Sequence, residues 1–295
     1  MELVISNLTK DFHGFKAVND ISLEMEKGVY GLLGVNGAGK TTLMRMLCTL
    51  MHPTIGTISY NGKDIFKLDG EYRKILGYLP QEYGFYPDFS VMDYLNYIAS
   101  IKGLRQSVAR KRVKEVLHQV GMEQYKSRKM KKLSGGMKRR IGIAQAILND
   151  PKILILDEPT AGLDPRERIR FRNLISELAQ DRLVLLSTHI VSDIECVASK
   201  IFLMKDGSIE LAGTAQELID SVPVKAWRCM LSPSDADMIQ RKYSVSNRRM
   251  VQGGVELRVI SKVRPCHGAI ADEMTLEDLF LYVFGEKAGD EDGEI

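Results

Sequence analysis

A glycine-rich turn between an apolar run and an amphipathic helix constrains the fold of this chain more than any other feature. The turn spans Gly34 to Thr41, reads Gly-Val-Asn-Gly-Ala-Gly-Lys-Thr and fits the pattern G-x-x-x-x-G-K-[ST]. The apolar run 29–33 before it predicts a short buried strand. After the turn, apolar residues recur at helical spacing until Pro53 stops the helix. The sequence therefore predicts a strand, a tight loop and a helix in this order.

The same loop is suited to binding phosphate groups. Its three glycines let the backbone approach phosphates closely, and the loop N–H groups and the start of the following helix favour anions. In this pattern the Lys40 ammonium reaches the β- and γ-phosphates and the Thr41 hydroxyl binds Mg²⁺. A chance match is the alternative, and the strand before and helix after the loop disfavour it. The candidate nucleotide-binding residues here are Gly34, Asn36, Gly37, Ala38, Gly39, Lys40, Thr41 and Thr42.

Two adjacent acidic residues follow a second apolar run. The run Ile153–Leu156 is typical of a strand buried on both faces of a parallel sheet, and Asp157 and Glu158 come directly after it. Such sheets bind ligands at the carboxyl ends of their strands. We therefore predict that Asp157 binds Mg²⁺ and that Glu158 orients or deprotonates the attacking water. A solvated acidic pair is the alternative, which the phosphate loop in the same chain disfavours.

The composition is that of an ordinary globular protein and disfavours several function classes. The 295 residues include 41 basic and 38 acidic ones, and the net charge of +3 is too small to indicate nucleic acid as a partner. The four cysteines form no C-x-x-C pair, so neither a zinc site nor a disulfide framework is indicated. No apolar run approaches the roughly 18 residues of a membrane helix, and the N-terminus is not typical of a secretory signal. Any membrane role is expected to come through a partner.

A cluster of basic residues lies between residues 126 and 140. Aromatic residues do not interleave its charges, as they do in many nucleic-acid sites. The cluster is therefore typical of a solvated helical face, or of a surface near anionic lipid headgroups. Its members are Lys126, Arg128, Lys129, Lys131, Lys132, Lys138, Arg139 and Arg140.

The chain divides into segments of different pattern. Short alternating strands are predicted at the start, and a mainly helical stretch at about 88–150. The composition changes near residues 221–223, which predicts a first domain at 1–219 and a small accessory domain at 220–287. The acidic, glycine-containing residues 288–295 are predicted to be disordered.

Further motifs resemble those of the ATP-binding cassette (ABC) proteins. Leu133–Gly136 reads Leu-Ser-Gly-Gly, like the signature sequence of that family, and Ser134 follows Lys40 by 94 residues (134 − 40). Gln81 in Leu-Pro-Gln-Glu, Ala161–Asp164 and the Ser-Thr-His run 187–189 match other motifs in the order of the family. Met137 and Val35 depart from the usual glutamine and proline, but neither position supplies a phosphate ligand.

The resemblance covers about residues 2–219 and implies an α/β fold. It implies a P-loop NTPase core with a mixed sheet, an N-terminal antiparallel β subdomain and an inserted α-helical subdomain, to which the small C-terminal α+β domain is added. It also implies hydrolysis of ATP to ADP and phosphate with Mg²⁺. In this family two domains pair head-to-tail. Ser134, Gly135 and Gly136 of one domain then close over the γ-phosphate held by the other.

The resemblance also implies roles for single residues. Gln81 senses Mg²⁺ and water near the transporter contact, and His189 contacts the γ-phosphate, although a packing role is its alternative. Asp164 communicates across the dimer. Phe12 stands where an aromatic residue, more often tyrosine, stacks on adenine. The predicted catalytic residues are Glu158, His189 and Gln81, and the predicted metal ligands are Thr41, Gln81 and Asp157.

Three functions fit such a chain. The first is the subunit of a membrane transporter that powers a separate integral membrane permease from the cytoplasmic face of the cell membrane. The second, a cassette protein of ribosomes or DNA, is disfavoured by the single cassette and by the absence of room for a long coiled coil. The third, a soluble ATPase of a cofactor-assembly complex, stays open. Thr275–Glu286 resembles the ends of bacterial exporter ATPases of the antibiotic-resistance and lantibiotic-immunity type. The expected partners are therefore ATP, a second identical or paired cassette subunit and a permease, and no nucleic acid.

Overall fold

The computed structural model describes residues 1–285, which divide into two compact units. Unit 1 is Met1–Leu211 and unit 2 begins at Ala212. The sequence prediction placed the boundary after residue 219. In the structure, helix α9 (Ala215–Asp220) packs against α11 (Leu276–Phe284) and therefore lies with unit 2. The tail predicted at 288–295 lies outside the described residues.

Unit 1 begins with an antiparallel sheet. Its four strands lie in the order β2-β1-β4-β5. Their bounds are Leu3–Phe12 for β1, Phe15–Met25 for β2, Ile55–Tyr60 for β4 and Lys63–Asp64 for β5. Leu3 and Ile5 are buried while Val4 is partly exposed, as expected for a sheet that covers a core with one face.

The second sheet of unit 1 is mixed and carries the predicted site. Its six strands lie in the order β10-β9-β3-β8-β7-β6, and those from β9 to β6 run parallel. Their bounds are Gly28–Leu33 for β3, Leu76–Leu79 for β6, Ile153–Leu156 for β7, Leu183–Thr188 for β8, Lys200–Lys205 for β9 and Ser208–Gly213 for β10. β7 and β8 are buried along their whole length, which explains their continuous apolar runs.

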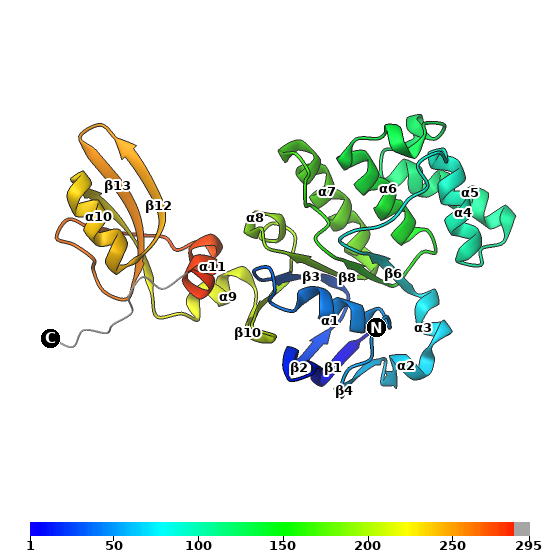
Figure 1. The fold of residues 1–295 in the computed structure, drawn as a ribbon, viewed down its shortest axis with the longest axis horizontal. Helices are drawn as coiled ribbons and strands as arrows, with labels where there is room; N and C mark the ends of the chain where they lie inside the picture. Colours follow the sequence, from blue (N-terminus) through cyan, green and yellow to red (C-terminus); the bar gives the residue numbers. More distant parts are fainter. Residues whose placement is uncertain (286–295) are drawn as a thin grey trace. The chain divides into compact units, whose positions relative to one another are not determined.

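Helices cover this sheet, and three of them form the predicted helical insertion between β6 and β7 (Figure 1). These are α4 (Val91–Ile101), α5 (Gln106–Gln119) and α6 (Gly135–Ile147), which pack against one another. The other helices of unit 1 are α1 (Lys40–Leu47), α2 (Ile65–Leu68), α3 (Gly70–Lys74), α7 (Pro165–Leu178) and α8 (Val191–Ile194), with 3-10 turns at Glu123–Tyr125, Met130–Lys132 and Ala179–Asp181. None of the helices within residues 1–285 has the length and apolar character needed to cross a membrane.

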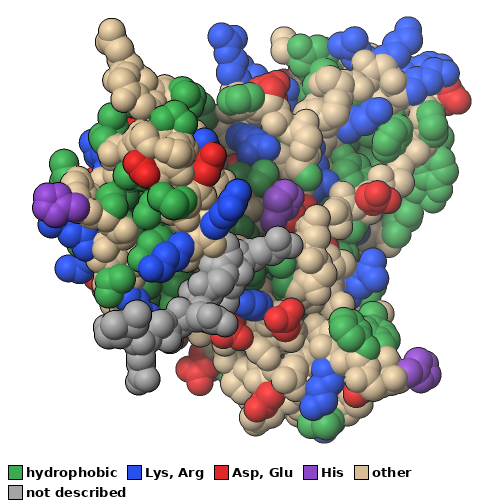
Figure 2. Space-filling view, turned by 60° about the vertical axis from the view of Figure 1, so that its left-hand side comes forward, with side chains coloured by type: hydrophobic (Ala, Val, Ile, Leu, Met, Phe, Trp, Pro, Cys, Tyr) green, Lys and Arg blue, Asp and Glu red, His purple; other side chains and the backbone are tan. Residues whose placement is uncertain are grey.

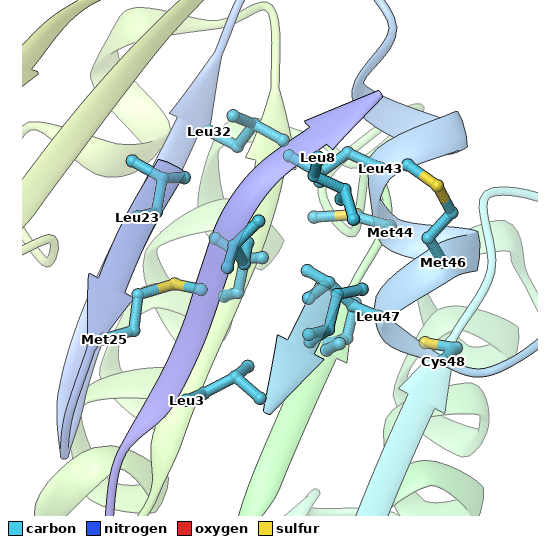
Figure 3. Packing of buried hydrophobic residues seen from close by; sticks show 14 of the residues in the cluster. Leu3, Leu8, Leu23, Met25, Leu32, Leu43, Met44, Met46, Leu47 and Cys48 are labelled. Atoms are coloured by element: carbon cyan, nitrogen blue, oxygen red, sulfur yellow. The ribbon is translucent and has the colours of Figure 1, made fainter. Parts of the chain in front are cut away.

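Helix α1 is fixed by a core that the two sheets of unit 1 share (Figure 3). Leu43, Met44 and Leu47 point from α1 into this core, where Leu8 of β1 and Leu32 of β3 also lie. All five side chains are almost completely buried. Burial of a leucine or methionine side chain is worth about 1.5–3 kcal/mol, so the position of α1 and of the loop before it is strongly determined.

As far as residue 285, unit 2 is a small antiparallel sheet with three helices. Its strands are β11 (Lys225–Leu231), β12 (Ser244–Val251), β13 (Gly254–Ser261) and β14 (Ile270–Asp272), in the order β12-β13-β11-β14. Helix α10 (Pro233–Lys242) packs on β11 and β13. A buried cluster that includes Cys229 and Leu257 forms the core of this unit. The α+β character predicted for this part of the chain is confirmed.

A buried carboxylate joins α11 to the sheet of unit 2. Asp278 is 2% exposed, completes the capping box of α11 by accepting from the N–H of the N-cap residue Thr275 at 2.9 Å, and accepts from Ser246 Oγ at 2.7 Å. Arg258 Nη2 on β13 donates to Asp278 Oδ2 at 2.8 Å. Burial alone would raise the pKa of Asp278, but the hydrogen bonds from Arg258, Ser246 and Thr275 outweigh it and hold the pKa below its usual value.

We expect Asp278→Asn to destabilise unit 2 by about 3 kcal/mol, because it leaves the Arg258 charge without its main partner. A carboxyl with a depressed pKa stabilises the fold above the unfolded pKa of about 3.9, and loses that contribution as the pH falls through the folded pKa. The variant should therefore show a flatter stability curve in acid. Trp227, the single tryptophan, lies in β11, so its fluorescence during urea unfolding reports on this unit.

Asp237→Asn is the matched control, because it breaks an Arg248–Asp237 pair of 2.7 Å that is largely exposed. Such a pair contributes about 1 kcal/mol or less. An equal loss of unfolding free energy in the two variants would contradict the structural role assigned to Asp278.

Candidate functional site

Four of the predicted segments meet because they follow four neighbouring parallel strands. Gly34 follows β3, His189 follows β8, Asp157 follows β7 and Gln81 comes shortly after β6. The Gly34 N–H donates to the Thr188 carbonyl at 3.3 Å, and the Asp157 N–H to the Leu79 carbonyl at 2.8 Å. The carboxyl ends of adjacent parallel strands lie at one edge of a sheet, which is where ligands bind in such folds.

The glycine-rich loop packs tightly on one side and faces open space on the other. Gly39 precedes α1 with a φ of 102°, and a Cβ atom there would lie 2.2 Å from the Ala17 carbonyl oxygen. A Cβ on Gly34 would lie 2.4 Å from the Met204 carbonyl oxygen. Gly37 also has a positive φ, of 87°, but no atom lies within 4 Å of its Cβ position. The open side is therefore the side available to a ligand.

Lys40 lies inside this loop. Its Nζ donates to the carbonyls of Gly34 at 2.6 Å and Val35 at 3.1 Å, and lies 3.6 Å from Glu158 Oε1. Burial lowers the pKa of Lys40, while the charges of Glu158 and Asp157 oppose that shift. The ammonium group is thus held between the loop and the two carboxylates.

One hydroxyl group links the two carboxylate residues. Ser187 Oγ donates to Asp157 Oδ1 at 2.6 Å and accepts from the Glu158 N–H at 2.9 Å. Glu158 has a left-handed backbone, with a φ of 46°, and its Oε2 lies 3.0 Å from His189 Nδ1. Neighbouring acids on one strand end are thereby directed apart. Asp157 points toward Ser187, and Glu158 toward His189 and Lys40.

The buried oxygens at this edge fit a magnesium ion that is bound together with phosphate. Asp157 Oδ2 and Glu158 Oε1 are buried and accept no hydrogen bond, which is costly unless a cation or donor approaches. Thr41 is the second residue of α1 and follows Lys40, whose Nζ lies 3.6 Å from Glu158 Oε1, and the Gln81 side chain is exposed. In residues 1–285, no three His, Cys, Asp or Glu side chains are grouped to hold a metal alone. Mg²⁺ needs no such group, because it takes one or two carboxylates and completes its shell with phosphate and water.

The predicted signature residues lie elsewhere in unit 1. Ser134 caps α6 by accepting from the Met137 N–H at 3.3 Å, and a Cβ on Gly136 would lie 3.3 Å from Glu167 of α7. Asp164 caps α7 by accepting from the Glu167 N–H at 2.9 Å. The exposed starts of α6 and α7 therefore lie side by side. Across the part of the chain that the structure describes, no hydrogen bond or ion pair joins Ser134 or Asp164 to Lys40.

Phe12 ends β1 at the hairpin with β2. Its ring is 40% exposed, and Lys10 Nζ lies 5.2 Å from the ring centroid. Ala17 in β2 is the residue whose carbonyl approaches Gly39 of the glycine-rich loop. The exposed ring is therefore carried by a strand pair that adjoins the loop, and a planar ligand can stack on it.

Two features that fix the acidic loop 157–164 were not expected from the sequence. Arg139 was assigned to a solvated basic face, which is wrong, because it is 8% exposed and donates to carbonyls of this loop. The sequence did contain a signal for the burial of Arg139, since this residue precedes the apolar Ile143 by one helical turn and therefore lies on the same face of the helix. The second feature is Asp193, a buried residue of α8 that accepts from Thr160 Oγ1 at 2.5 Å.

Comparisons with known proteins agree with this geometry. A sequence model of the family described as ABC transporter matches residues 18–161. The uncharacterized ABC transporter ATP-binding protein YxlF of Bacillus subtilis is 40% identical over 217 residues, which are 73% of this chain and 72% of the relative. The Nod factor export ATP-binding protein I of Burkholderia lata is 38% identical over 73% of this chain and 71% of its own. An Fe(3+) ions import ATP-binding protein, FbpC 1 of Rhizobium meliloti, is also 38% identical, over 74% of this chain and 63% of its own.

Solved structures of cassettes have the same fold. A structure described as the ATP-binding subunit of an ABC transporter has a TM-score of 0.67 and 27% identity, and covers 75% of this chain and 92% of its own. The dimeric structure of a bacterial ABC transporter cassette has a TM-score of 0.65 at 24% identity, over 72% of this chain and 98% of its own. The predicted α/β fold with a P-loop core is confirmed by these likenesses.

We expect Gly39→Ala and Gly37→Ala to differ in their effect on stability, although both glycines have a positive φ. Alanine at position 37 only has to adopt a left-handed backbone, which costs about 1 kcal/mol. Alanine at 39 must also displace the Ala17 carbonyl, so we expect a loss of about 3 kcal/mol. Urea unfolding of the two variants measures the difference. Similar losses would show that the loop does not pack as described.

Proposed function

This chain belongs to the ATP-binding proteins of the ABC transporter family, and from this premise we propose that it drives a separate membrane permease that exports its cargo. Members of the family are ATPases, so the activity is the hydrolysis of ATP. The proposal concerns the residues that perform it, the partners and the direction of transport. One observation carries it: Lys40, Asp157 and Glu158 come together at one sheet edge, with two buried carboxylate oxygens that lack hydrogen bonds.

In this proposal, the glycine-rich loop and Lys40 bind the β- and γ-phosphates of ATP, beside the open space at Gly37. Thr41, Asp157 and Gln81 hold Mg²⁺, which neutralises negative charge on the phosphates when it is bound. Phe12 stacks on the adenine ring.

Glu158 is the proposed general base. Its Oε2 is fixed at 3.0 Å from His189 Nδ1, while Oε1 accepts no hydrogen bond and is free to accept one from the attacking water. As the water oxygen bonds to the γ-phosphorus, the bond from this phosphorus to the bridging oxygen breaks and ADP leaves, while the proton of the water passes to this carboxylate. His189 orients Glu158 and contacts the γ-phosphate.

A second subunit completes each ATP site in this proposal. Ser134, Gly135 and Gly136 begin α6, and the start of a helix of this length favours anions. Within residues 1–285, no hydrogen bond or ion pair joins them to Lys40 of their own chain, so we assign them to the γ-phosphate held by a partner cassette. Asp164 lies at the adjacent exposed start of α7 and would meet the partner as well. The dimeric cassette structure of the same fold supports this assignment.

An exposed aromatic group near Gln81 is the proposed contact with the permease. Tyr86 and Tyr97 are 48% and 37% exposed, and their ring centroids lie 5.2 Å apart. Phe89 completes the group at 4.9 Å from Tyr86. Exposed hydrophobic side chains gather near Lys and Arg side chains on the face shown in Figure 2. Apolar rings beside the Gln81 segment suit a short amphipathic helix of a membrane protein.

Export is proposed from the C-terminal segment Thr275–Glu286, because it resembles the ends of bacterial exporter ATPases. Relatives of similar identity include a Nod factor export protein and an Fe(3+) ions import protein, so names of relatives do not decide the direction. The proposed location is the cytoplasmic face of the cell membrane. The alternative partner is a soluble assembly complex.

We expect Glu158→Gln to lower ATP turnover by at least about 100-fold while ATP binding is retained, because glutamine cannot take the proton of water. The variant should also accumulate as an ATP-bound dimer. Phosphate release and size-exclusion chromatography with MgATP measure the two effects. Lys40→Ala is the comparison, and it should weaken ATP binding itself. Undiminished turnover in Glu158→Gln would defeat the assignment of the base.

We expect the chain to co-purify with an integral membrane protein from detergent-solubilised membranes of its own cells. Tyr97→Ser should reduce recovery of that protein, because it removes one ring of the exposed group. Met238→Ser is the matched control, since Met238 is an exposed apolar residue on α10. Recovery with assembly factors or ribosomes, and with no integral membrane protein, would overturn the transporter assignment.

A further inference from the structure

The guanidinium group of Arg139 lies beneath the loop that carries Glu158. Arg139 Nε donates to the Pro159 carbonyl at 2.8 Å, and Nη2 donates to the carbonyls of Asp157, at 2.8 Å, and of Glu158. Nη1 donates to the Gln81 carbonyl at 2.9 Å. One side chain of α6 thus binds the backbone of two separate segments of the site, the loop after β7 and the segment after β6.

This arrangement is unusual for a buried cation. Buried arginines commonly pair with a carboxylate, whereas Arg139 forms no ion pair among residues 1–285. Its planar fork of five N–H donors instead matches several carbonyl oxygens at once. Burial lowers the pKa of Arg139, and the neighbouring Tyr83, Asp157 and Glu158 oppose that shift. Hydrogen bonds to the two segments therefore stabilise the buried cation.

The backbone of Glu158 needs such support. Its φ of 46° lies in the left-handed region, which L-residues other than glycine seldom adopt. Ser187 Oγ holds its N–H group and Arg139 holds its carbonyl group. With both backbone groups held, the side chain is directed toward His189 and Lys40. Without Arg139, the carbonyls of residues 157–159 would lack this common donor, and Glu158 could return to a relaxed backbone.

We propose that Arg139 is a positioning residue that fixes Glu158 in its reactive orientation and couples it to the Gln81 segment. This inference rests on the proposed role of Glu158 as the general base. Arg139 belongs to the helix that begins at Ser134, so a shift of that helix start is passed to Glu158 of the same chain. A shift of the Gln81 segment is passed on through the same guanidinium group.

The test compares Arg139→Met and Arg139→Lys with the wild type. We expect Arg139→Met to lower kcat about 100-fold, the effect typical of a misplaced catalytic group, with the affinity for ATP unchanged within about threefold. This loss corresponds to about 2.7 kcal/mol at 1.36 kcal/mol for each factor of ten. Lysine keeps the charge but reaches fewer carbonyls, so Arg139→Lys should lower kcat about tenfold. This variant serves as the test if the methionine variant fails to fold.

Arg112→Met is the matched control. Arg112 also donates to backbone carbonyls, to Leu148 at 3.2 Å and Ile147 at 3.0 Å, but at the other end of α6. We expect it to lower thermal stability while kcat per folded molecule is retained. A purely structural role of Arg139 would instead make its variants behave like Arg112→Met.

The outcomes separate this inference from the function on which it rests. Loss of turnover in Glu158→Gln and in Arg139→Met, with ATP binding kept in both, supports the inference. Loss of turnover in Glu158→Gln, together with wild-type kcat in both Arg139 variants, overturns it and leaves the proposed function intact. A fall in kcat that merely follows a fall in ATP affinity overturns it as well. Normal turnover in Glu158→Gln is the separate result that defeats the proposed base.

Discussion

The rest of the site depends on two acidic residues at the end of one buried strand. Asp157 and Glu158 follow β7 where solvent is excluded, and each has a carboxylate oxygen without a hydrogen bond. Unpaired buried carboxylate oxygens are stable only if cations and donors approach them. Lys40, whose Nζ lies 3.6 Å from Glu158 Oε1, and the proposed Mg²⁺ meet that need. The parallel arrangement of β3, β8, β7 and β6 makes this possible, because it brings the segments that follow these strands to one edge.

Features with local signals could be predicted from the sequence. The loop before α1 combines a fixed glycine pattern with a strand and a helix, and the apolar run 153–156 indicated a fully buried strand. Both signals depend on residues within one short segment. The start of α4 depends on an equally local pattern, because Ser90 and Asp93, three residues apart, form its capping box.

Features that depend on distant segments could not be predicted in the same way. The partners of Arg139 are backbone carbonyls, which carry no signature in the sequence, and they come from two separate loops. Its charge and its basic neighbours suggested solvent exposure instead. Asp193 and Thr160 are far apart in the sequence and form a buried pair only after β7 and β8 are aligned. Helix α9 lies with unit 2 because it packs against α11, a contact that composition does not reveal.

The same geometry explains why one chain carries half of each proposed site. The residues proposed to hold phosphate and to activate water meet at the sheet edge, whereas Ser134 and Asp164 lie at the exposed starts of two adjacent helices. Helix α6 connects the two sets, because Ser134 begins it and Arg139, little more than one turn later, binds the loop of Glu158. A partner nucleotide at the start of α6 and a permease at the Gln81 segment would therefore act on the same glutamate. In this proposal, hydrolysis depends on the contact at the start of α6 and on the contact at the Gln81 segment, and Arg139 links both of them to Glu158.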